Sequence, residues 1–258
     1  MREMLEGLEP EPGDDPVARV RAAQQAPRIK RFYTDVATAP AEDGGFAILL
    51  DGRPVRTPAR NLLRAPTPAL AEALAAEWAA QGEEINPFSM PLTRLVNVAI
   101  DRVAPEVAAV REEVGRYIGS DMLFYRAEGP DSLVQRQSAL WDPVLATFDR
   151  TYGARFYLSE GIRHVAQPPE AVARMADLIP REPLALAAVH SMTTLTGSAL
   201  LALAVAGGHL DADAAWAAAH VDEDFNRERW GEDEAATARR AARHIEMDAA
   251  AQLLQLLG

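Results

Sequence analysis

Two histidines in this chain are each followed, four residues later, by an aspartate. His220 precedes Asp224 and His244 precedes Asp248, so each pair shares one face of its helix. If those helices pack together, the four side chains could converge on zinc or iron, which accept imidazole nitrogen and carboxylate oxygen as ligands. A metal-dependent hydrolase or oxidase is therefore one hypothesis. The alternative is two solvated pairs, each worth roughly a few tenths of a kcal/mol. We favour this alternative, and we expect no metal ligand and no catalytic residue.

The second candidate site is the segment VDEDFNRERWG near the end of the chain. It places Asp222, Glu223 and Asp224 next to Phe225, and its helix is expected to stop at the glycine after Trp230. General acid–base catalysis needs two carboxylates in unlike environments that face one cleft, and a sequence does not reveal a cleft. We interpret Phe225 and Trp230 as core anchors. We interpret the acids around Phe225 as a rim that contacts a partner. The residues expected to bind this partner are Glu223, Asp222, Asp224 and Phe225.

Common enzyme signatures are missing from the sequence. It contains no GxxxxGK[ST] phosphate loop, no GxGxxG after a strand, no GxSxG elbow and no HExxH. The absence of cysteine excludes disulfides, thiolate catalysis and thiolate zinc sites. A formal net charge of −12 argues against a nucleic-acid partner, because binding phosphates requires a basic face.

The sequence also bears on the compartment. It lacks a run of about 18 uncharged apolar residues, so we expect no stable membrane insertion. Its start, MREMLEGLEPEPGDDP, is acidic and rich in proline, unlike a secretory signal or a mitochondrial presequence. We therefore expect a cytoplasmic protein, and the sequence leaves its oligomeric state open.

The elements that would position these residues indicate an α+β fold. Short strands are expected at 31–36, 45–50, 55–57 and 61–65, with a hairpin turn at Asp51–Gly52. Leu70, Leu74 and Trp78 form a helical stripe that would cover this small antiparallel sheet. We expect a flexible acidic tail at 1–28, a β-rich domain with its covering helix at 29–88, and a mainly helical, orthogonal bundle-like domain at 89–258.

Helices dominate the second half of the chain. One is expected from Asp131 to Trp141, followed by a kink or a new helix from Pro143 to about residue 152. A long buried helix is expected at 184–206, and another at 211–229. The last helix is expected to start at residue 232 or 233. Trp78, Trp141 and Trp230 are expected to be structural anchors.

An ordered series of segments runs along the chain, beginning with KRFYTDV and GGFAILLDGRPVRTP and ending with DEDFNRERWG. Its most specific parts are E-W-x-x-Q around Trp78, the M-P-L-T-x-L-x-N segment that follows it, and the later Y-R and W-D-P. This series resembles the Atp12 family, the assembly chaperones of the F1 sector of ATP synthase. The resemblance covers about residues 28–246, and the missing presequence suggests a bacterial-type member.

This resemblance implies a β-rich N-terminal domain, a helical C-terminal domain, no catalysis and no cofactor. It implies that the partner is the free α subunit of F1, whose β-facing interface is shielded until the α/β ring forms. Glu223 lies where the family carries an acidic residue associated with function, and the neighbouring Asp222 and Asp224 fit the same position. Binding to a different partner is the remaining alternative.

Overall fold

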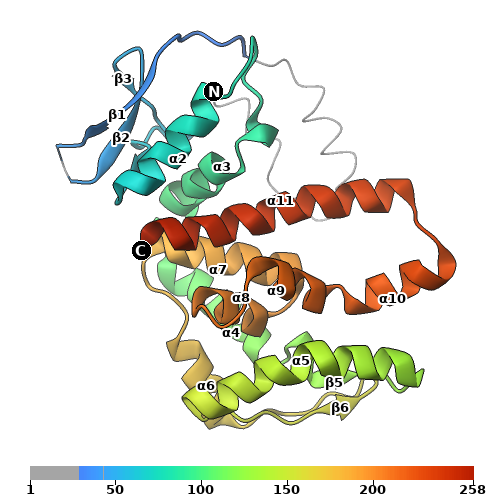
Figure 1. Cartoon of the computed structure of the whole chain (residues 1–258). Helices are drawn as coiled ribbons and strands as arrows, with labels where there is room; N and C mark the ends of the chain where they lie inside the picture. The colour runs from blue at the N-terminus through green and yellow to red at the C-terminus, as the bar shows by residue number, and fades with distance from the viewer. Residues whose placement is uncertain (1–28, 43) are drawn as a thin grey trace. The chain divides into compact units, whose positions relative to one another are not determined.

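The structure is a computed structural model that describes residues 29–42 and 44–258, so the expected tail at 1–28 lies outside the described residues. The described chain forms two compact units, one ending at Asp101 and the other beginning at Arg102. The first carries a small antiparallel sheet and the second is mainly helical, which confirms the expected α+β fold (Figure 1). Among the described residues, no helix combines the length and apolar character needed to span a membrane.

The sheet of the first unit is built around its second strand. That strand, β2 (Phe46–Leu50), pairs antiparallel with each of the others, which are β1 (Val36–Pro40), β3 (Arg53–Pro54) and β4 (Arg64–Ala65). The turn between β2 and β3 places Asp51 and Gly52 at φ values of 47° and 76°. Positive φ at both positions is what the Asp-Gly pair favours in a two-residue hairpin, as the sequence predicted.

Helix α2 (Pro68–Ala79) covers this sheet and contacts β1 and β2 (Figure 1). It begins where the Thr67 hydroxyl accepts a hydrogen bond from the Leu70 amide, and Pro68 takes the first helical position, where its missing N–H costs little. The side chains of Leu70 and Leu74 are fully buried. The sheet alone is too small to be stable in water, so this apolar face of α2 completes its core.

The segment from Arg31 to Asp35, expected as a strand, is irregular, and β1 begins only at Val36. Its side chains bind the end of α2 instead of a neighbouring strand. The Tyr33 hydroxyl donates to the Trp78 carbonyl at 2.7 Å, and the Arg31 guanidinium donates to the Gln81 carbonyl. Carbonyls at a helix C-terminus lack partners within the helix, so these bonds account for the departure from strand geometry.

The E-W-x-x-Q motif around Trp78 connects helix α2 to the helix that follows it. After the short 3-10 turn η3 (Pro87–Ser89), helix α3 (Pro91–Val98) starts without a capping side chain of its own. The Glu77 carboxylate, from α2, accepts from the amides of Leu92 and Thr93 at 2.8 and 2.7 Å. Gln81 accepts from the Asn86 amide at 2.7 Å. These residues therefore cap and connect helices within the first unit.

Asp101 closes the first unit. Its Oδ1 accepts from the Thr57 hydroxyl at 2.6 Å and from the Asn61 side chain at 2.9 Å, and its Oδ2 accepts from the Ala59 amide. The chain runs on through the π-helical turn η4 (Ala99–Val103) and the 3-10 turn η5 (Ala104–Glu106). The two units divide at this turn, which lies later in the chain than the boundary expected after residue 88. The first unit extends this far because α3 packs on α2 and because Asp101 binds the segment between β3 and β4.

The second unit contains eight α-helices within its described residues. They are α4 (Val107–Ile118), α5 (Asp131–Tyr152), α6 (Pro169–Asp177), α7 (Pro183–Thr196), α8 (Ala199–Ala206), α9 (Ala212–Ala219), α10 (Val221–Trp230) and α11 (Glu234–Leu257). The 3-10 turn η6 (Met122–Phe124) leads into a two-stranded parallel ladder of β5 (Tyr125–Arg126) and β6 (Ser159–Glu160). Helices α7 and α8 form the apolar centre, in which most side chains are buried.

The long helix expected at 184–206 is instead two helices, α7 and α8. Gly197 ends α7 with a φ of 73°, and the Ser198 hydroxyl then caps α8 by accepting from the Leu201 amide at 3.0 Å. Asp121 fixes this break, because its carboxylate accepts from the Ser198 hydroxyl at 2.7 Å and from the Leu200 amide at 3.0 Å. Burial raises the pKa of Asp121 to about 6 although these hydrogen bonds favour its ionised form.

Two other helix boundaries differ from the expectation. Helix α5 continues through Pro143 without a break, because Trp141, Val144 and Phe148 all bury on its inner face and outweigh the roughly 3 kcal/mol that an interior proline costs. The helix expected at 211–229 divides at His220, where the backbone leaves helical geometry at φ −111° and ψ 16°. This break turns the acidic segment into a separate helix.

Candidate functional site

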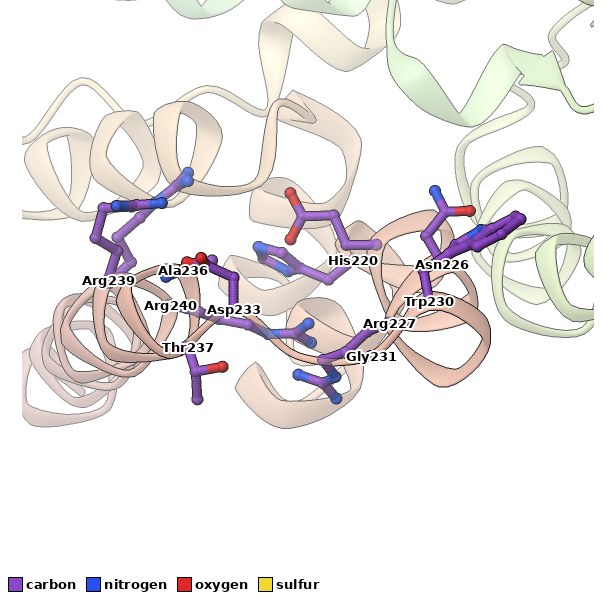
Figure 2. A pocket seen from close by; sticks show the side chains of 12 residues that line it. His220, Asn226, Arg227, Trp230, Gly231, Asp233, Ala236, Thr237, Arg239 and Arg240 are labelled. Atoms are coloured by element: carbon purple, nitrogen blue, oxygen red, sulfur yellow. Dashed lines mark hydrogen bonds between the residues drawn. The ribbon is translucent and has the colours of Figure 1, made fainter.

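The candidate site is a pocket between α10 and α11, with a volume of about 470 Å³. Helix α10 stops at Gly231, whose φ of 91° favours glycine, and the Asp233 carboxylate then caps α11 by accepting from the Ala236 amide at 2.7 Å. This tight connection brings the two helices together as the walls of the pocket. Figure 2 shows Trp230 and Asn226 at one end of the pocket, Arg239 at the other and His220 between them.

Arginines are the most frequent charged residues in this lining. The pocket residues that carry charge are Glu223, Arg227, Asp233, Arg239, Arg240 and Arg243. Four cations and two anions therefore meet in a protein whose formal net charge is −12. Sequence reasoning missed the cations of α11, although Arg239 and Arg243 are four residues apart and so share a helix face.

Two of the three acids at the start of α10 are occupied by bonds within the unit. Asp222 accepts from the Gln137 side chain of α5 at 2.7 Å. Asp224 pairs with both terminal nitrogens of Arg240 and with Arg227 at 3.0 Å. Burial acts to raise the pKa of Asp224, but the hydrogen bonds from Arg240 and the charges of both arginines outweigh it and hold that pKa below its ordinary value.

Glu223 lies between these two acids and is exposed, and it lines the pocket. Phe225, on the inner side of the helix, has only 5% of its surface exposed. The guanidinium groups of Arg229 and Arg136 lie 4.3 and 5.4 Å from the centre of its ring. Of the four residues expected to contact a partner, Glu223 is the one whose side chain faces open space at the pocket, and the others hold α10 in place.

The three expected tryptophan anchors differ in burial. Trp141 is 1% exposed, and its indole N–H donates to the Ala218 carbonyl at 2.8 Å. Trp78 is half-buried, with the Tyr33 ring 5.9 Å away. Trp230 is 84% exposed, so the expectation that it anchors the core is wrong. It is the last residue of α10, where the stop at Gly231 leaves its side chain beyond the packed face of the helix.

The four side chains considered as metal ligands do not form one site. His220 is buried, and its Nδ1 lies 2.8 Å from the Trp216 carbonyl. Asp224 is paired with arginines, as described above. His244 and Asp248 lie instead beside Asp213 of α9, with the His244 Nε2 3.2 Å from the Asp213 carboxylate. The Trp216 ring packs against both imidazoles, and its centre lies 3.9 Å from that of His220 and 5.0 Å from that of His244. The hypothesis of a four-ligand site is therefore wrong, because the Trp216 ring lies against both imidazoles and Asp224 is paired with arginines.

Comparisons with known proteins give a consistent result. The family model described as ATP12 chaperone protein matches residues 30–149. The crystal structure of Atp12 from Paracoccus denitrificans is 41% identical in sequence, with a TM-score of 0.83, over 89% of this chain and 98% of that chain. The Atu1473 protein of Agrobacterium tumefaciens is 51% identical, with a TM-score of 0.88, over 99% of this chain and 95% of that chain. The mitochondrial atp12 protein of Schizosaccharomyces pombe is 26% identical over 219 residues, which is 80% of this chain and 75% of that protein.

Proposed function

Because the chain belongs to the Atp12 family, whose members are chaperones of ATP synthase assembly and not enzymes, we propose that it binds the free α subunit of F1. In this proposal it shields the α surface that later faces the β subunit, until the α/β ring forms. The similarity to Atp12 of Paracoccus denitrificans along most of the chain carries the proposal. The similarity to bacterial relatives supports the proposal that the chaperone binds its client in the cytoplasm.

The α10–α11 pocket has the properties that transient binding of a protein surface requires. Trp230 offers a large exposed aromatic group, and aromatic and arginine side chains contribute most of the binding energy in protein interfaces. Charged groups of both signs surround it, which favours specific and salt-sensitive association over a permanent apolar seal. A chaperone that must release its client needs such a surface.

Within this surface we assign the client contact to Glu223. Asp222, Asp224 and Phe225 position it, because each of them bonds to or packs on another part of the second unit. The tie to Gln137 fixes the N-terminal end of α10 on α5, and the fork between Arg136 and the Glu228 carboxylate, at 2.8 and 2.7 Å, fixes the other end. The helix therefore presents Glu223 on a rigid support.

A charge reversal at Glu223 tests this assignment. Purified wild-type protein, Glu223→Lys and the control Asp177→Lys are compared for binding to isolated α subunit and for suppression of its aggregation. Asp177 is an exposed acid in the last turn of α6, so the control makes the same change in charge away from the pocket. We expect Glu223→Lys to weaken binding by about tenfold or more while its unfolding curve stays like that of the wild type. Wild-type protein that fails to bind α subunit would refute the proposed function.

A further inference from the structure

The α10–α11 pocket contains two arginines, Arg239 and Arg243, that form no ion pair with a carboxylate in the part of the chain that the structure describes. Arg240 and Arg227 share Asp224, and Arg227 also reaches Glu232 at 3.4 Å. Arg243, in contrast, donates only to the neutral carbonyl of Leu195, and Arg239 has no hydrogen bond or ion pair to any described residue. Positive charge is therefore left over at the end of the pocket formed by α11.

These two arginines are placed to bind one acidic group together. They are four residues apart on α11, so they project from one face of the helix. Guanidinium groups bind carboxylates through two parallel N–H donors, and such bonds are about twice as strong as those between neutral groups. A carboxylate at this end would give both cations the anionic partner that the described residues do not supply.

The opposite end of the pocket carries the exposed aromatic ring of Trp230, beside the side-chain amide of Asn226. Figure 2 shows Trp230 well separated from Arg239, with the length of the pocket between them. A ligand that uses both ends must therefore be extended, with a negative group at one end and an apolar group at the other. The volume of about 470 Å³ lies within the range of about 300–1,000 Å³ that small-ligand pockets occupy.

The other charges of the pocket decide between a peptide and a polyphosphate. Glu223 and Asp233 also line it, and the whole chain carries a formal net charge of −12. Several phosphate charges would be repelled by both carboxylates, whereas a carboxylate brings a single negative charge beside two arginines. Glu223 is also free to accept a backbone N–H or a basic side chain from a peptide.

We infer that the α10–α11 pocket binds an extended acidic peptide segment, with an Asp or Glu carboxylate on Arg239 and Arg243 and an apolar side chain on Trp230. The inference rests on the proposed function for its client, since the segment would belong to the free α subunit. It adds the chemistry by which the client is recognised, and it assigns that recognition to residues of α11 in addition to Glu223 of α10.

The test compares Arg239→Gln/Arg243→Gln with a matched control, Arg163→Gln/Arg181→Gln, which removes two exposed arginines of the same unit outside the pocket. Binding of isolated α subunit is measured at low and at physiological salt, with ATP and inorganic phosphate as competitors. We expect the pocket variant to bind at least about tenfold more weakly and to lose most of the salt dependence, while the control stays near wild type. Because Arg243 also contacts Leu195, Arg239→Gln alone is measured as a variant that leaves this contact intact.

A second measurement uses a probe that does not depend on the client. Short synthetic peptides with Asp next to Leu are titrated against copies that carry Asn instead of Asp. Preference for the Asp peptides that disappears in Arg239→Gln/Arg243→Gln supports the inference. Equal binding of α subunit by wild type and by this variant overturns the inference and leaves the proposed function standing. Displacement of α subunit by ATP at lower concentration than by the Asp peptides also overturns it, in favour of a phosphate ligand.

Discussion

Replacing Glu77 by alanine removes the cap that α2 supplies to α3. Two backbone amides, of Leu92 and Thr93, would lose their only described acceptor. Hydrogen bonds to charged groups contribute about 1.5–3 kcal/mol each, and losing an N-cap costs about 0.5–2 kcal/mol. Burial raises the pKa of Glu77, which means that part of the free energy gained from these hydrogen bonds offsets the cost of burying its charge. We therefore expect a loss of about 2–4 kcal/mol, a large part of a typical stability of about 5–15 kcal/mol.

Hydrogen exchange measures this loss where it occurs. In Glu77→Ala, the amides of Leu92 and Thr93 should exchange about 30- to 1,000-fold faster, as about 2–4 kcal/mol requires. Urea unfolding followed by circular dichroism should show the first unit unfolding at lower denaturant. Glu72→Ala is the matched control, because Glu72 is an exposed glutamate of the same helix. If the two variants differ by less than about 0.5 kcal/mol, the capping role of Glu77 is refuted.

Three further outcomes are expected. The pKa of Asp121 is raised from 3.8 to about 6 in the folded protein, so the folded state holds its proton more tightly than the unfolded state. The stability that this provides is present below pH 4 and is lost as pH rises through 6, by about 3 kcal/mol in total. The free energy of unfolding of Asp121→Asn should lack this dependence on pH. Trp141→Phe should lower the free energy of unfolding by about 2 kcal/mol, since it leaves the buried Ala218 carbonyl without its donor, and an unchanged urea midpoint would contradict this. Trp230→Ala should change stability by less than about 0.5 kcal/mol but weaken α-subunit binding by about 30-fold in a titration, and the reverse pattern would return Trp230 to a structural role.

The parts of the fold that sequence reasoning predicted are those set by local chemistry. The Asp51–Gly52 hairpin follows from two residues that accept positive φ, and the start of α2 follows from Thr67 and Pro68. Strand β2 follows from an apolar run next to that hairpin. In each case the signal lies within a few residues, so the rest of the chain is not needed to recognise it.

The parts that sequence reasoning missed depend on distant partners. A glycine inside an apolar run is compatible with one long helix or with two shorter ones. Here the break at Gly197–Ser198 is held by Asp121, which is distant in the sequence. Likewise, α5 stays helical at Pro143 because its own residues Trp141, Val144 and Phe148 are buried against the rest of the unit. Local patterns cannot reveal either effect, because the deciding contact is made only in the folded unit.

The candidate site shows the same division. The acidic segment was recognised from its composition, but its pocket exists only because Gly231 and Asp233 bring α11 back beside α10. Trp230 was misassigned because an apolar residue at the end of a helix has the same spacing whether it faces the core or the solvent. The same limit applies to Asp213, which joins His244 from another helix.

The exposure of Trp230 gives the protein an intrinsic optical reporter. The chain has four tryptophans, and Trp141 and Trp216 are only 1% and 7% exposed, while Trp78 is half-buried. Collisional quenchers dissolved in water will therefore reach Trp230 first, and the quenched part of the emission will come mainly from the end of α10. Protection of that emission would reveal occupancy of the pocket in unlabelled protein, and its time course would report how long a client stays bound.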